Sequence, residues 1–218
     1  MLAVLSILSM SFLAGLSGAI MPGPILTLTM AEAAKRGARA GPLIVLGHGL
    51  LELAMVCALV VGLARILNRP AVFGTIGVVG GLALLVMAAA MIRTPAFLPD
   101  SAGGRSGVGG AFGPAALGAG ISLANPYWTV WWVTVGVGIL ARAVPLGMPG
   151  IVAFFAGHIL ADLGWYTVVA VGIASGRRFL TPAVYRGLVI ACGAALGGLG
   201  AWFLWSGGRT LLKFAEYS

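Results

Sequence analysis

Six apolar segments, each long enough to cross a lipid bilayer, make up most of this chain of 218 residues. A transmembrane helix needs about 20 apolar residues, because each residue adds about 1.5 Å and the hydrocarbon layer is about 30 Å thick. Only 8% of the residues are charged and the mean hydropathy is +1.07, which is more apolar character than a water-soluble fold of this length can bury. The sequence therefore predicts an all-α membrane protein with six transmembrane helices, at roughly 3–31, 43–64, 71–92, 114–141, 150–174 and 183–206.

The basic residues lie almost entirely outside these segments and form no patch interleaved with aromatic residues. The net charge of +8 therefore does not indicate nucleic-acid binding, and we expect no nucleic-acid partner. Eight of the thirteen basic residues lie in or beside the first, third and fifth loops, namely Lys35, Arg36, Arg39, Arg93, Arg105, Arg177, Arg178 and Arg186. By the positive-inside rule, these loops face the cytoplasm and both termini lie outside, in a plasma-membrane protein. The sequence contains no P-loop and no dinucleotide-binding fingerprint, so it predicts no ATP use and no cofactor.

Two halves of the sequence repeat each other. The phrase GHGLLEL at 47–53 returns as GHILADL at 157–163, and AIMPGPILTL at 19–28 is matched by SLANPYWTV at 122–130. Each half therefore contains three membrane segments. Because three is odd, the two halves must enter the membrane from opposite sides, as an inverted repeat. We predict one membrane domain with repeats at 1–98 and 114–218 and a flexible linker at 99–113.

The first segment of each half is interrupted by proline. Pro22, Gly23 and Pro24 lie in one segment, and Asn125 and Pro126 lie in the other. Proline removes a backbone hydrogen bond and clashes with the preceding turn, at a cost of about 3 kcal/mol. A broken backbone inside a membrane is tolerated where it faces protein or a wet cavity, so the paired breaks indicate a central binding site. The alternative is a pair of kinks used only for packing.

Both histidines of the chain stand four residues before an acid, as His48 with Glu52 and His158 with Asp162. Residues four apart share one helix face, and both pairs fall near the middle of the hydrocarbon layer. A carboxylate there costs at least about 2.5 kcal/mol unless it is paired or neutralised, so we expect it to have a function. It could exchange protons with histidine as relay, or all four residues could bind a divalent metal. The alternative without function is a polar contact that holds helices together.

Aromatic residues follow the second break. Trp128 and Trp132 are also four apart and could line a cavity or offer ring faces to a cation. Packing or lipid contact would explain them equally well.

The motifs resemble those of LysE-type amino-acid exporters, which include the RhtB type. The resemblance is carried by MPGP at 21–24, AKRGARAG at 34–41, LGHGLLE at 46–52 and NPYWTVWW at 125–132. It implies six helices and efflux of small amino acids against inward proton flow, with Pro22, Gly23, Pro24, Asn125 and Pro126 at the central site. Many members have Lys where this chain has Tyr127. The wider superfamily also contains metal exporters.

We therefore expect a transporter and not an enzyme, namely a secondary exporter of amino acids or close relatives that works by alternating access. The broken ends at Pro24 and Pro126 would offer free amides to a substrate carboxylate, with a further hydrogen bond from Asn125. The partners would be the amino acid, protons, the lipid bilayer and a second copy in a homodimer. The alternatives are a divalent-cation exporter that uses the two His–carboxylate pairs, and a membrane-embedded enzyme with a metal centre at the same residues.

Overall fold

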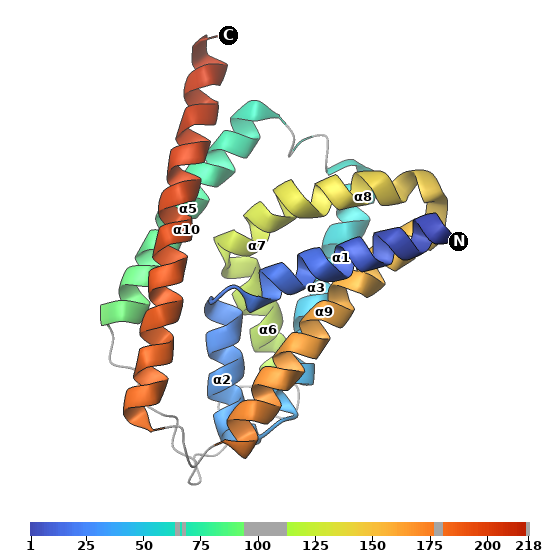
Figure 1. Cartoon of the computed structure of the whole chain (residues 1–218). Helices are drawn as coiled ribbons and strands as arrows, with labels where there is room; N and C mark the ends of the chain where they lie inside the picture. Colours follow the sequence, from blue (N-terminus) through green and yellow to red (C-terminus); the bar gives the residue numbers. More distant parts are fainter. Residues whose placement is uncertain (64–65, 67–68, 94–112, 177–180, 217–218) are drawn as a thin grey trace.

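The computed structural model describes the chain except for residues 64–65, 67–68, 94–112, 177–180 and 217–218. Every element in the described part is helical (Figure 1). The elements are α1 (Leu2–Ile20), α2 (Pro24–Arg36), α3 (Ala40–Ala58), the π-helical η1 (Leu59–Leu63), α5 (Pro70–Arg93), α6 (Gly113–Ala124), α7 (Pro126–Trp131), the π-helical η3 (Trp132–Gly136), α8 (Val137–Ala143), the 3-10 helix η4 (Val144–Leu146), α9 (Gly147–Ser175) and α10 (Pro182–Glu216).

The chain breaks at the two predicted places. α1 ends at Ile20 and α2 begins at Pro24, while α6 ends at Ala124 and α7 begins at Pro126. Each proline is the first residue of its new helix, where the missing N–H removes no helical hydrogen bond. Figure 1 shows the consequence: α1 runs at an angle to α2, and α7 and α8 run at an angle to α6.

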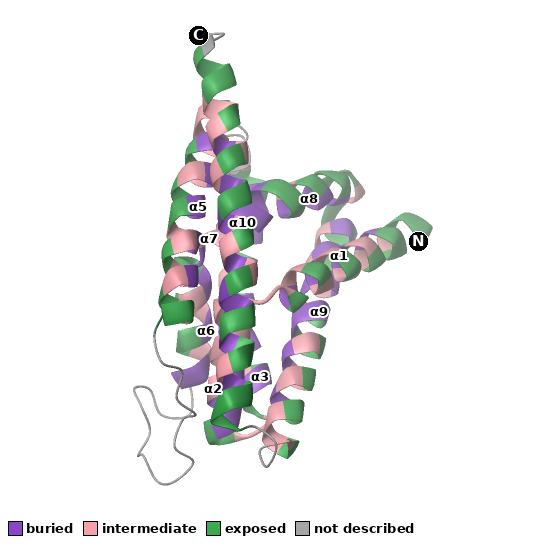
Figure 2. Cartoon of the chain, turned by 60° about the vertical axis from the view of Figure 1, so that its left-hand side comes forward, coloured by how far each residue is buried: buried purple, intermediate pink, exposed green. Residues whose placement is uncertain are grey.

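The all-α membrane prediction is confirmed. Five helices of the described part are long and apolar enough to cross a membrane by length and composition, and Gly113–Ala124 is a shorter apolar helix. Much of the outer surface of the helices is exposed (Figure 2). The exposed residues include large apolar ones such as Val61, Val86 and Leu123. Such a surface suits contact with lipid. Nearly all of the predicted linker at 99–113 lies outside the described residues.

The helices α5 and α10 form a long pair at one side of the molecule (Figure 2). Glycines permit the close approach: a Cβ at Gly77 would lie 2.9 Å from the Cα of Gly207, and one at Gly81 would lie 2.7 Å from the carbonyl oxygen of Gly200. Small residues at such positions let membrane helices pack backbone to backbone.

The two histidine-bearing helices each pack on one of the helices that precede a break. α3 lies against α6, where a Cβ on Gly47 would overlap the carbonyl oxygen of Ala115. α9 lies against α1, where a Cβ on Gly157 would overlap the carbonyl oxygen of Leu8. The glycine of each GH phrase is therefore the residue that lets the backbones touch, and the histidine that follows it is carried into the centre of the molecule.

Candidate functional site

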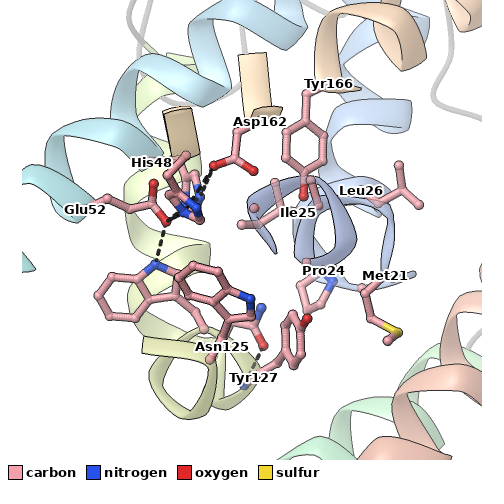
Figure 3. A pocket seen from close by; sticks show the side chains of 17 residues that line it. Met21, Pro24, Ile25, Leu26, His48, Glu52, Asn125, Tyr127, Asp162 and Tyr166 are labelled. Atoms are coloured by element: carbon pink, nitrogen blue, oxygen red, sulfur yellow. Dashed lines mark hydrogen bonds and ion pairs between the residues drawn. The ribbon is translucent and has the colours of Figure 1, made fainter. Parts of the chain in front are cut away.

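A cavity that is partly open to the outside lies where the two breaks meet α3 and α9 (Figure 3). It is lined by Gly15, Gly18, Ala19, Met21, Gly23, Pro24, Ile25, Leu26, His48, Glu52, Asn125, Tyr127, Trp128, Trp131, His158, Asp162 and Tyr166. Both halves of the chain therefore contribute to one cavity.

Both histidines and both acids come together at this cavity and are almost fully buried; we call them the His–acid cluster (His48, Glu52, His158 and Asp162). Oε1 of Glu52 lies 3.0 Å from Nε2 of His48 and 2.9 Å from Nε2 of His158. Oδ2 of Asp162 lies 3.6 Å and 3.5 Å from the same two nitrogen atoms. Each acid thus contacts the histidine of the other half as well as its own.

Two further side chains fix the cluster. The Ser122 hydroxyl donates to the carbonyl of Gly118 at 2.6 Å, and its oxygen lies 2.6 Å from Nδ1 of His48. The indole N–H of Trp128 donates to Oε1 of Glu52 at 3.3 Å. Three nitrogen atoms therefore contact Oε1 of Glu52, and both ring nitrogen atoms of His48 have a polar partner.

The second histidine is held on one side only. Nδ1 of His158 has no hydrogen-bond partner among the described residues and faces Gly15, where an added Cβ would lie 2.7 Å from it. Gly15 stands 107 residues before Ser122, the same offset as between Leu8 and Ala115. Because Gly15 has no side chain, His158 lacks the hydroxyl contact that Ser122 makes with His48.

The breaks differ in the hydrogen bonds they leave open. The side chain of Asn125 accepts from the amide of Tyr127 at 3.1 Å and so caps α7. The prediction that the helix end at Pro126 offers free amides was therefore wrong, because the side chain of Asn125 already accepts the hydrogen bond of the Tyr127 amide. The start of α2 has no side-chain cap, so the amides of Ile25 and Leu26 have no intrahelical partner at the edge of the cavity.

Most residues predicted for the site line this cavity, but Pro22, Pro126 and Trp132 do not. Trp132 is fully buried behind it, with its ring 5.9 Å from Phe154 of α9. The sequence reasoning missed Trp131, Tyr166 and the small residues of α1. Trp131 stacks on His158 with ring centroids 4.5 Å apart. Trp131 lies within NPYWTVWW, but no motif marks the others, and tertiary packing brings all of them to the cavity.

Replacing Trp128 by Phe is expected to lower stability more than replacing Trp132 by Phe. Both changes remove the same volume, but only the indole of Trp128 donates to a carboxylate, a bond worth about 1.5–3 kcal/mol. The N–H of Trp132 is buried without a partner among the described residues. Thermal unfolding of both variants in detergent checks this, and an equal loss in both would contradict the role of the Trp128 bond.

Comparison with protein families gives a match that covers nearly all residues of the cavity. A model described as LysE type translocator matches residues 16–207, a range that contains both breaks and the whole His–acid cluster. Comparisons with curated proteins and with solved structures give no match. Members of the matched family are transporters and not enzymes. The chain therefore belongs to the LysE type translocator family and transports amino acids or related compounds across a membrane.

Proposed function

We propose that this protein exports amino acids or close relatives across the plasma membrane, driven by inward proton flow, through alternating access around the central cavity. In this proposal the loops after α2 and α9 and before α6 face the cytoplasm, as their basic residues predict. The cavity that both breaks share with the His–acid cluster is the observation that carries the proposal.

Alternating access needs two halves that can rock against each other, and recurring contacts support an inverted repeat at 1–98 and 114–218. The contact of Gly47 with Ala115 corresponds to the contact of Gly157 with Leu8. Gly157 follows Gly47 by 110 residues in the histidine helices, and Ala115 follows Leu8 by 107 residues in the helices before the breaks. The histidine helix of each half packs on a helix of the other half, α3 on α6 and α9 on α1. Movement of one half against the other would therefore shift residues on both sides of the cavity.

The polar groups of the cavity suit a zwitterion. Glu52 and Asp162 would attract the substrate ammonium group, and the uncapped first turn of α2 would receive its carboxylate, since amides and helix dipole both favour an anion there. No Lys or Arg lines the cavity among the described residues. The substrate carboxylate would therefore depend on backbone amides, because Tyr127 stands where many relatives have Lys.

Proton coupling would use the same carboxylates. Glu52 and Asp162 are buried among the membrane spans and would exchange a proton when the substrate amine leaves. His48 and His158 lie within contact of both acids and would relay the proton. Each charge that moves through a potential of 100 mV supplies about 2.3 kcal/mol, enough for substantial accumulation outside.

Transport in proteoliposomes tests this function. Vesicles are loaded with a mixture of amino acids in EDTA-containing buffer, and an imposed pH gradient, acidic on the side that corresponds to the cell exterior, is expected to drive one class of amino acid toward the acidic side. Vesicles without protein or without the gradient are the controls. Retention of every amino acid at the control rate would contradict amino-acid export, and gradient-independent loss would contradict proton coupling.

A further inference from the structure

The four side chains of the His–acid cluster bring one nitrogen or oxygen atom each close together. These atoms are Nε2 of both histidines, Oε1 of Glu52 and Oδ2 of Asp162. The four nitrogen–oxygen distances run from 2.9 to 3.6 Å. Ligand atoms of His48, Glu52 and Asp162 all lie within 4.8 Å of one another.

We propose that the His–acid cluster is a binding site for one divalent transition-metal cation, of the kind that Zn²⁺ and Co²⁺ represent. Nitrogen and oxygen ligands lie about 2.0–2.2 Å from such an ion, so neighbouring ligands are about 3–3.5 Å apart, as they are here. Imidazole together with carboxylate favours first-row transition metals over Mg²⁺ and Ca²⁺, which prefer oxygen ligands alone.

The tautomer of His48 supports a metal ligand. A carbonyl oxygen cannot donate, so the hydroxyl hydrogen of Ser122 goes to Gly118 and its oxygen must accept from Nδ1–H of His48. Nε2 of the ring then faces two carboxylate oxygens. Either a second proton on Nε2 or a metal cation between the nitrogen and the oxygens makes this arrangement favourable, and a metal ion would displace that proton. A hydrogen-bonded second ring nitrogen is also the usual arrangement in metal-binding histidines.

Charge and unmet hydrogen bonding point the same way. When both carboxylates are ionised and both imidazoles are neutral, the cluster carries a charge of about −2 in apolar surroundings, which a dication neutralises. Oε2 of Glu52 and Oδ2 of Asp162 are buried without a hydrogen-bond partner among the described residues. Glu52 is 1% exposed, so bulk water does not satisfy it. A bound ion would take one oxygen or both from each acid.

The metal would occupy the place that the proposed function gives to the proton and the substrate amine. It follows that Zn²⁺ should inhibit transport, and this consequence alone rests on the proposed function. The binding itself does not depend on what the protein carries.

Metal titration of the purified, EDTA-treated protein tests the site. Calorimetry with Zn²⁺ is expected to give one ion per chain, and Co²⁺ is expected to give visible absorption bands of nitrogen–oxygen coordination. Glu52→Gln and His158→Gln should each weaken Zn²⁺ binding by at least about 100-fold, and Ser122→Ala by about 10–100-fold because it frees the His48 ring. Glu32→Gln, which changes a buried acid outside the cavity, should leave it unchanged.

Thermal unfolding of each variant in EDTA separates lost binding from lost folding, and His48→Gln serves where one variant fails to fold. Absence of Zn²⁺ binding by the folded wild-type protein would overturn the proposal. So would binding that Glu52→Gln and His158→Gln leave intact, since the ion would then lie elsewhere. Amino-acid export measured in EDTA is independent of all these results, so the site and the transport function fail separately.

Discussion

Replacing Glu52 by Gln is expected to reduce amino-acid export by about 100-fold while the protein stays folded. The change preserves the shape of the side chain but removes its charge. Glu52 is the acceptor for Trp128 and contacts both histidines, and loss of about 3 kcal/mol of charge-assisted bonding corresponds to about 100-fold. Uptake and efflux in proteoliposomes measure the effect, and circular dichroism with thermal unfolding measures the fold.

Glu32→Gln provides the matched control for this variant. Glu32 is also buried, but it pairs with Lys35 and Arg36 at 3.4 Å and 2.7 Å, near the end of α2 and outside the cavity. Its loss should leave export within a few-fold of the wild-type rate. Full export by Glu52→Gln, or an equal loss in both variants, would show that Glu52 has no special place in transport.

Replacing Gly157 by Ala is expected to destabilise the protein strongly and to abolish transport. The new methyl group would overlap the carbonyl oxygen of Leu8, which is backbone and cannot rotate away. Overpacking usually costs about 1–3 kcal/mol, and a contact with a rigid backbone should lie at the upper end of that range or above it. The change also pushes α9 away from α1 and moves His158 out of the cluster.

Gly164→Ala tests the same helix without the clash, because nothing lies within 4 Å of a Cβ there. It should leave stability unchanged or raise it by up to about 1 kcal/mol, since Ala favours helix more than Gly. Melting temperatures in detergent compare the two variants. Equal temperatures would mean that the glycine of the GH phrase does not set the distance between α1 and α9.

The broken helices and the stacking of each histidine on its own acid could be predicted, because each depends on local chemistry. Proline ends a helix wherever it stands, and a spacing of four places His48 above Glu52 in any helix. Whether each histidine would serve only its own acid could not be read from the spacing. The cross-contacts of His158 with Glu52 and of His48 with Asp162 arise from how α3 and α9 pack.

Other parts of the site depend on packing alone. Ser122 begins the repeated phrase SLANPYWTV, but its contact with His48 appears only once α6 lies on α3. Trp128 and Trp132 do share a helix face, with ring centroids 6.3 Å apart, but Phe154 of the second half covers Trp132. Asn125 could be predicted as a helix cap from its place before Pro126, and that reading would have excluded free amides at the second break.

Accessibility of a single cysteine in the cavity tests alternating access around this site most directly. Cys57 and Cys192 are replaced by Ser, and Met21, which lines the cavity at the first break, is replaced by Cys. A membrane-impermeant thiol reagent is then applied to one side of the membrane at a time. The account predicts labelling from both sides, with rates that shift in opposite directions when substrate or the pH gradient is added. Labelling from one side only, unchanged by substrate and by pH, would contradict it.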